Sequence, residues 1–419
     1  SSANLNAASF VSADATGADF RGASLIGADF LRTTFTDADL TGAVIGRADL
    51  IEATLFGLSE DQIVRTRSYQ TRSLDGVIFA RNELSDWDFS RQSLVRADFE
   101  RAVLSGADLS SSVLNDAGFD RTDLVGADLS DSSLADANFF FATLTNADLS
   151  GAELNGASLF RTDLTGAVFD QAVVNETSLR EATTSGFTAA QLYSTASYQN
   201  GDLRGIDLRS NDLTGWDFSG QDLSDANFDQ TVLTGADLSG AIITDTEFTR
   251  LPAGTLTAEQ IYSTASYQAS DLQGVRITSA DLAGWDFAGQ NLRTASFNGS
   301  DLTASDLRSA SLVSANMNAA DLTDANLRAA DLSGARLNGA VLSGADLAGA
   351  TIASARLEST TDSGFTAEQL YSTASYQSGN LRGVNLDRNT MDGWDFSTQD
   401  LTSASFEDAR LVGADLAGA

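Results

Sequence analysis

The sequence predicts an all-β solenoid, a stack of coils in which the chain turns after every five residues. Large apolar side chains return at every fifth position, as in Leu25, Phe30, Phe35 and Leu40. A small side chain, usually alanine, stands two residues before each of them, and Asp or Asn often lies between the two. Repeat arrays form one body whatever their length, so we expect residues 1–419 to be a single continuous β-helix.

A five-residue period fits neither a helix nor an ordinary strand. A helix repeats every 3.6 residues and would move the large side chains off one face within two turns, whereas a strand would send alternate members to opposite faces. A short side with two inward positions, its central residue and the residue two before it, explains the pattern. The chain must then turn after each side, and neighbouring coils must stack to bury both positions.

On these residues the chain resembles the pentapeptide repeat family. The resemblance covers nearly all of it, in five stretches: 3–57, 72–181, 201–250, 270–359 and 379–418. It implies a right-handed quadrilateral β-helix with four pentapeptides in each coil. The large residue would then fill the axis, and alanine would let the neighbouring side approach.

Four blocks, which we call the helical blocks, interrupt the five-residue grid at 58–71, 182–200, 251–269 and 360–378. In each block a Ser or Thr stands three residues before a glutamine and directly after a hydrophobic residue, which is the pattern of a capping box with a hydrophobic staple. These N-cap candidates are Ser59, Thr188, Thr257 and Thr366. We expect a short helix of about two turns in each block, stable only when it packs on the coil.

The spacing of the helical blocks predicts that their helices share one face. With four pentapeptides in a coil, each segment between blocks closes into whole coils if a block replaces one side of its coil. The four short helical excursions would then project from the same face of the solenoid.

Eight aromatic residues of the blocks, and of the coils that follow them, form the candidate interaction face. Tryptophan is too large for an inward position that alanine normally fills, so we expect each Trp to turn outward and pack against the helix. The eight residues are Trp87, Trp216, Trp285, Trp394, Tyr69, Tyr198, Tyr267 and Tyr376. Aromatic side chains often anchor partners at interfaces, and packing at a structural junction is the alternative explanation.

Polar residues also occupy the inward position next to each tryptophan. Five residues before it stand Asn82, Asn211 and Asn389, with Ala280 at this position in the third copy, and five residues after it stand Gln92, Gln221, Gln290 and Gln399. A buried amide needs hydrogen-bond partners. We expect these to be backbone groups that the excursion frees.

The amino-acid composition excludes most of the side-chain chemistry that enzymes use. The 419 residues include no histidine, cysteine or lysine, so all 25 cationic side chains are arginine. The commonest general base, thiolate metal sites and Schiff-base chemistry are therefore excluded. We expect no enzyme, no catalytic or metal-binding residue and no cofactor. The sequence also lacks an apolar run of 18 residues, so we expect no membrane span.

The formal net charge of −33 restricts the possible partners. Such a body should repel nucleic acid and could attract basic protein surfaces or diffusely bound cations, so we expect no direct nucleic-acid binding. The family resemblance implies an alternative, because some pentapeptide repeat proteins mimic DNA and bind type II topoisomerases such as gyrase. The other explanation of the columns of Asp is that Asp suits its position in the repeat and keeps the array soluble.

The leading functional hypothesis is a non-enzymatic structural or protein-interaction scaffold, an acidic rod that stacks end to end on itself or binds another protein. The five-residue grid begins at Ala3 and runs to Gly418 without a capping segment, which suggests a fragment of a longer array or a rod that stacks. Absent lysine and abundant Asp, Ser, Thr and Ala favour an extracellular or cell-surface location over the cytoplasm.

Overall fold

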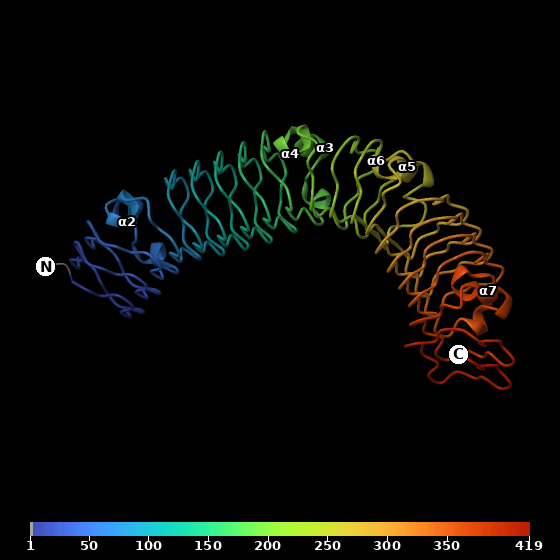
Figure 1. The fold of residues 1–419 in the computed structure, drawn as a ribbon. Coiled ribbons are helices and arrows are strands. Elements are labelled where there is room, and N and C mark those ends of the chain that lie inside the picture. The colour runs from blue at the N-terminus through green and yellow to red at the C-terminus, as the bar shows by residue number, and fades with distance from the viewer. Residues whose placement is uncertain (1–2) are drawn as a thin grey trace. The chain divides into compact units, whose positions relative to one another are not determined.

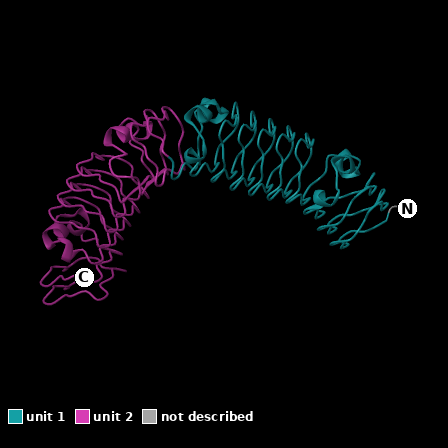
Figure 2. Cartoon of the chain, turned by 180° about the vertical axis from the view of Figure 1, so that it is seen from behind, with its two compact units in different colours: residues 1–211 teal, residues 212–419 magenta. Residues whose placement is uncertain are grey.

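The computed structural model describes residues 3–419. The chain divides into two compact units, one ending at residue 211 and the other running from 212 to 419 (Figure 2). Each unit is a stack of coils that carries short helices along it (Figure 1). That residues 1–419 form one continuous body stays a prediction.

Each coil takes up twenty residues, which is four pentapeptides. Single parallel β-bridges join residues twenty apart, for example Asp108 to both Asp88 and Asp128. The only longer strands among residues 3–419 are β1 (Glu247–Thr249) and β2 (Arg276–Thr278), which pair in parallel. The predicted β-solenoid is therefore confirmed.

Both inward positions of the pentapeptide are buried. Ala127 and Leu129 illustrate the pattern, since neither has any exposed side-chain surface. At other coils phenylalanine rings stack directly over one another. The ring of Phe119 lies 5.2 Å from that of Phe99 and 4.7 Å from that of Phe139, nearly parallel to both. This apolar column holds each unit together, because burying one large side chain contributes about 1.5–3 kcal/mol.

The Asp that precedes the large residue shapes the turn that follows. Its carboxylate accepts a hydrogen bond from the backbone N–H two residues on, at 2.9 Å from Ser130 to Asp128 and at 2.9 Å from Thr303 to Asp301. The next residue of the turn is left-handed, with φ of 54° at Asp131. Asp is favoured in both roles, because its short side chain bonds the turn backbone and it tolerates positive φ.

Each helical block contains two short helices where the sequence predicted one. The first helices are α1 (Glu60–Val64), α3 (Ala189–Ser194), α5 (Ala258–Tyr262) and α7 (Ala367–Ser372). The second helices are α2 (Arg67–Gln70), α4 (Ala196–Gln199), α6 (Ala265–Gln268) and α8 (Ala374–Gln377). None of the helices within residues 3–419 has the length and apolar character needed to cross a membrane.

The prediction of one helix was wrong because a threonine starts a new helix in the middle of each block. The hydroxyl of Thr264 accepts the N–H of Tyr267 at 3.1 Å, and Thr264 itself has extended backbone angles. Threonine is a favoured N-cap for this reason. In three blocks a 3-10 helix also precedes the first α-helix: η1 (Ala53–Phe56), η2 (Thr183–Ser185) and η3 (Thr361–Ser363).

Each helical block adds nine residues to one coil. The bridges across the blocks join residues 29 apart instead of twenty, at Asp49–Ile78, Ser178–Asp207, Glu247–Arg276 and Arg356–Asn385. Twenty-residue coils then resume, so the two blocks of each unit are separated by whole coils and lie on the same side of that unit (Figure 1). A single face shared by all four blocks stays a prediction.

Candidate interaction face

The capping-box glutamine ties the first helix of each block to the coil before it. In the fourth block the Gln369 side-chain oxygen accepts the N–H of Thr366 at 2.8 Å, and its amide nitrogen donates to the carbonyls of Leu342 and Ala345 at 2.7 and 2.9 Å. Gln62, Gln191 and Gln260 bond the preceding coil in the same way. The predicted capping box is confirmed in all four blocks.

A buried serine ties the second helix of each block to the preceding coil. The hydroxyl of Ser375 accepts the N–H of Ile352 at 2.9 Å, and that of Ser266 accepts the N–H of Ile243 at 3.0 Å. Ser68 and Ser197 make the equivalent bonds. Both helices of a block are therefore fixed on the solenoid, which explains how helices of four to six residues persist.

In the first, third and fourth blocks, tyrosine hydroxyls hold the residue that follows the tryptophan. In the third block the Tyr267 hydroxyl donates to the carbonyl of Asp286 at 2.9 Å, while the Tyr262 hydroxyl accepts the N–H of Asp286 at 2.5 Å. Tyr376 and Tyr371 hold Asp395 in the fourth block with the same geometry. We call this arrangement the tyrosine clamp.

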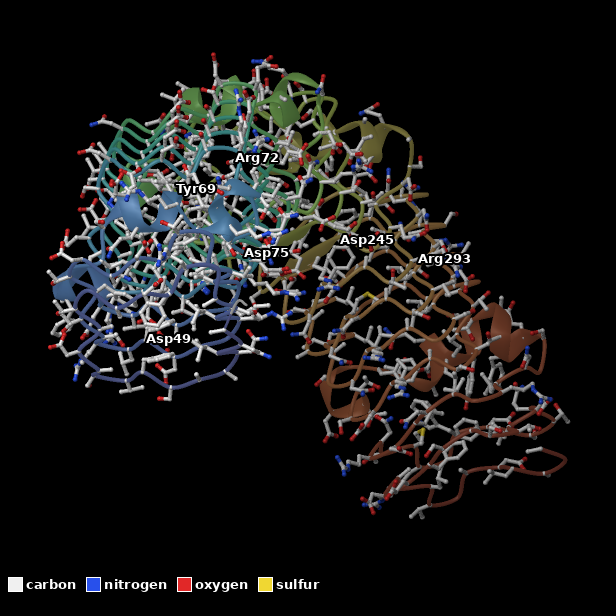
Figure 3. The ribbon with its side chains drawn as sticks, turned by 90° about the vertical axis from the view of Figure 1, so that its left-hand side faces the viewer. Asp49, Tyr69, Arg72, Asp75, Asp245 and Arg293 are labelled. Carbon is white, nitrogen blue, oxygen red and sulfur yellow. The ribbon has the colours of Figure 1, made fainter. Side chains whose placement is uncertain are left out.

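The first block makes the tyrosine clamp with one substitution. Tyr69, on the helical segment of that block (Figure 3), donates to the carbonyl of Asp88 at 2.8 Å. Val64 takes the place of the other tyrosine, and the carboxylate of Glu60 accepts the Asp88 N–H at 2.8 Å. In the second block Tyr198 is half-buried, with its ring 4.5 Å from that of Tyr193.

The tryptophans lie between the helices and the coil. Each of the four exposes 9% of its surface. The Trp285 ring is 6.3 Å from that of Tyr262, and the Trp394 ring is 5.8 Å from that of Phe365. The prediction that Trp packs against the helix is confirmed for Trp285, because Tyr262 belongs to α5, whereas Phe365 precedes α7. Trp87 lies beside Phe89, at 5.9 Å, and Trp216 beside Phe218, at 6.3 Å. Recognition of a partner by the eight aromatic residues stays a prediction.

A buried asparagine closes the loop that enters three of the blocks. The Asn389 side-chain oxygen accepts the N–H groups of Thr360 and Thr361 at 2.8 and 2.9 Å, and its amide nitrogen donates to the carbonyl of Leu357 at 2.7 Å. Asn82 and Asn211 bond their loops equivalently. The predicted backbone partners are therefore confirmed for the asparagines.

The glutamines that follow the tryptophans confirm the prediction of backbone partners only in part. The Gln290 amide nitrogen donates to the carbonyl of Tyr267 at 3.1 Å. Within residues 3–419, the buried side-chain oxygens of Gln92, Gln290 and Gln399 have no hydrogen-bond partner. These glutamines are thus less well satisfied than the asparagines.

Alkaline pH should loosen the helical blocks through the tyrosine clamp. Burial, followed by the charges of Asp88 and Glu60, raises the pKa of Tyr69 to about 12, and burial followed by the charge of Asp286 raises the pKa of Tyr267 to about 12. A folded-state pKa above the ordinary value of about 10 gives stability that is complete below pH 10 and lost between about pH 10 and 12. We therefore expect the melting temperature to fall across this window.

The chain suits this measurement because it has no lysine or cysteine. Tyrosines are then the side chains that titrate between pH 9 and 12, and absorbance at 295 nm follows them directly. A Tyr69→Phe/Tyr267→Phe variant should start less stable and lose less of its stability over the window. An unchanged pH dependence in this variant would contradict the prediction.

One exposed cluster in the first unit was missed by the sequence analysis. We call it the Phe–Arg corner, and it consists of Phe140, Phe141, Phe160, Arg121, Arg161 and Arg180. The three rings lie 4.3 to 5.3 Å from their neighbours, and each guanidinium lies 4.7 to 6.0 Å from a ring. Phe141 is 40% exposed and has φ of 57°. The signal was the run Phe139–Phe141, which places two aromatic residues, Phe140 and Phe141, in one turn.

Within residues 3–419, acidic side chains form no cluster of three or more that could hold a metal ion. The carboxylates are occupied mainly by turn N–H groups and by arginines. Bonds from Thr303 hold the pKa of Asp301 below its usual range, as bonds from Thr214 do for Asp212. The acidic surface is therefore distributed over many turns.

Comparison with family models finds a match to a model described as pentapeptide repeats in eight copies. The matched residues are 3–42, 18–57, 93–131, 132–171, 212–250, 270–308, 291–328, 303–339, 325–361 and 380–418. Together these ranges cover well over half of the chain. A comparison with curated proteins finds no match.

Several solved structures are similar to this chain. HetL, a pentapeptide repeat protein involved in heterocyst differentiation regulation from the cyanobacterium Nostoc sp. strain PCC 7120, is 21% identical over 71% of this chain and 97% of its own, with a TM-score of 0.20. A pentapeptide repeat protein from the Arabidopsis thaliana thylakoid lumen is 38% identical over 22% of this chain and 68% of its own, with a TM-score of 0.16. Full-length QnrB1, a plasmid-mediated fluoroquinolone resistance protein, is 19% identical over 66% of this chain and 92% of its own, with a TM-score of 0.17.

Proposed function

Because this chain belongs to the pentapeptide repeat family, we propose that it is a non-enzymatic structural and protein-interaction scaffold. Its coils form the right-handed, four-sided stack of that family, in keeping with twenty residues per coil. The helical blocks supply one interaction surface, through the aromatic residues that the tyrosine clamp positions. Other proteins, or further copies of the chain, are the partners.

The Phe–Arg corner is the observation that supports this proposal best. A left-handed backbone costs an L-residue about 1–2 kcal/mol, and Phe141, with φ of 57°, recovers little by burial because it is 40% exposed. Gly, Asn or Asp would suit this turn better. Aromatic residues and arginine are enriched at the centres of protein interfaces. A partner that covers the corner would bury an aromatic ring that the fold leaves 40% exposed.

Self-association end to end is one specific form of the scaffold proposal. In the last described coil the central Leu416 is 43% exposed, whereas the central leucines of inner coils such as Leu129 are fully buried. A further coil stacked on this surface would bury Leu416 and pair the strand edge.

Sedimentation velocity and negative-stain electron microscopy over a range of concentrations test this form. We expect concentration-dependent end-to-end particles, which a Leu416→Asp variant should lose. Val113→Asp is the matched control, since Val113 is 38% exposed within the first unit and should leave assembly unchanged. A strictly monomeric protein at high concentration would overturn the end-to-end form.

An acidic DNA mimic that binds a type II topoisomerase such as gyrase is the second candidate function. Its support is the charge of −33 and the column of bridged aspartates Asp88, Asp108, Asp128 and Asp148. Membership of a family in which some proteins mimic DNA agrees with this candidate. Supercoiling and pull-down assays with purified gyrase at low salt test it. Absence of any association with gyrase at low salt would contradict the DNA-mimic function.

An extracellular or cell-surface location is proposed together with this function, on the absence of lysine and the abundance of Asp, Ser, Thr and Ala. Cell fractionation with an antibody to the protein tests the location. Recovery only from the cytoplasm would overturn it.

A further inference from the structure

The third helical block differs from the other three at the loop that leads into it. Blocks one, two and four enter through a 3-10 helix that ends at a left-handed glycine, with φ of 90° at Gly57, 88° at Gly186 and 94° at Gly364. The third block instead enters through residues 250–255, Arg-Leu-Pro-Ala-Gly-Thr, and forms no 3-10 helix there. It also carries Ala280 where the fourth block has the buried Asn389.

These differences replace polar contacts by apolar surface at one place. In the fourth block Thr360 and Thr361 bond Asn389, whereas Leu251 and Pro252 occupy the equivalent positions in the third. Leu256 is only half-buried, although its counterparts Phe187 and Phe365 are 4% and 3% exposed.

A separate ion pair holds the altered loop in position. Asp229, whose side chain is 6% exposed, accepts bonds from both Nε and Nη2 of Arg250, and Thr249 donates to the same carboxylate at 2.7 Å. The fourth block has Asn338 in place of this aspartate and Ser359 in place of the arginine. The third block therefore lacks the asparagine and holds its loop with this ion pair instead.

The result is a cavity of about 530 Å³ between the loop, helix α5 and the following coil. Leu251, Pro252, Leu256, Leu282 and Trp285 supply its apolar lining. This size is typical of pockets that bind ligands. The equivalent place in the fourth block is a more open and more polar depression of about 630 Å³, lined by Thr361, Asp362, Thr390 and Asp392 among others.

The polar residues around the cavity indicate the charge of its occupant. Glu259 and Asp281 line it and are exposed to solvent. They add to the field of a chain with a net charge of −33, which raises the local concentration of cationic partners. The cavity thus combines an apolar interior with an acidic rim.

We propose that this cavity is a docking site for a basic segment of a partner protein, which inserts one bulky apolar side chain. The apolar side chain contacts Leu251, Leu256 and Trp285, and flanking Lys or Arg side chains face Glu259 and Asp281. This inference rests on the proposed scaffold function and assigns one partner class to one of its four blocks.

Labelled peptides of the sequence Gly-Lys-Arg-X-Arg-Lys-Gly, with X as Phe, Leu or Ala, test the site by fluorescence anisotropy. Burying a Leu or Phe side chain contributes about 1.5–3 kcal/mol, so the Phe and Leu peptides should bind roughly 10- to 100-fold more tightly than the Ala peptide. A Phe peptide with Glu in place of its basic residues should not bind. Equal binding of the Phe and Ala peptides, or no binding of any peptide, would overturn the proposal.

Two variants locate the binding. Leu256→Phe introduces the residue of the second and fourth blocks and fills the cavity, so it should abolish the preference for Phe over Ala while the melting temperature holds or rises. Leu58→Phe makes the same change in the first block, where Leu58 is 5% exposed, and should leave binding unchanged. Replacing residues 250–255 by residues 359–364, together with Ala280→Asn, should also remove the preference.

Sedimentation of the same samples separates this inference from the scaffold proposal. Self-association without side-chain-selective peptide binding would overturn the cavity inference alone. Peptide preference that persists in Leu256→Phe would likewise overturn it, because the peptide would then bind elsewhere on the acidic surface. Selective binding by a protein that never self-associates would overturn only the end-to-end form of the scaffold.

Discussion

Replacing Phe119 by alanine should lower the free energy of unfolding of the first unit by about 3–5 kcal/mol, the usual cost of removing a buried phenyl ring. The Phe119 ring is fully buried and lies between those of Phe99 and Phe139. The backbone ladder fixes the separation of successive coils, so the walls cannot close on the space that the ring leaves. The cost should therefore lie at the upper end of the range for such substitutions.

Chemical denaturation with hydrogen exchange measures this effect. Phe141→Ala is the matched control, because it removes the same ring from an exposed turn and should change the stability by less than about 1 kcal/mol. Coils of a solenoid contact only their neighbours, so protection should be lost first around residues 99–139. Equal losses in the two variants would contradict the burial argument.

Asn389→Ala should cost about 2–4 kcal/mol in the second unit, because each buried backbone group that loses its partner costs about 1–3 kcal/mol. The substitution leaves the N–H groups of Thr360 and Thr361 without their acceptor, and it removes the donor to the carbonyl of Leu357. Thermal and denaturant unfolding of the purified variant give the value.

Two comparisons sharpen the asparagine experiment. Asn380→Ala changes an exposed asparagine of the same unit and should cost little. Asn389→Ala combined with residues 250–255 in place of 359–364 should lose less stability than Asn389→Ala alone, because the third block already combines that loop with Ala280. If the combined variant loses as much stability as the two changes lose when they are made separately and added, the third-block loop does not compensate for the missing amide.

The coil architecture was predictable because the period of the sequence is the length of one side. Each pentapeptide repeats the same two inward positions, and a pattern visible at Leu25 and Phe30 recurs to the end of the chain. The capping boxes were predictable for a similar reason, since Thr366 and Gln369 lie three residues apart. The break between α7 and α8 was missed because Thr373 was not recognised as a second N-cap.

The contacts that build the candidate face were not predictable from local sequence. Gln369 bonds carbonyls 27 and 24 residues away, and Tyr267 reaches Asp286, 19 residues on. These pairs meet only because the coils stack with a twenty-residue step. Writing the sequence in rows of twenty would have placed Phe140 above Phe160. The change of Asn to Ala at position 280 was visible, but the cavity beside it depends on the path of the Pro252 loop.

The whole-coil separation of the helical blocks sets a rule for how such a chain can change length. Duplication or deletion of twenty residues between two blocks of a unit moves them apart or together by about 4.8 Å without turning either to another side. A five-residue change would rotate every later block by one side. Within a unit, insertion or deletion of whole coils can therefore change the distance between two binding surfaces in regular increments while each surface keeps the direction in which it faces. A bivalent partner would select among these lengths.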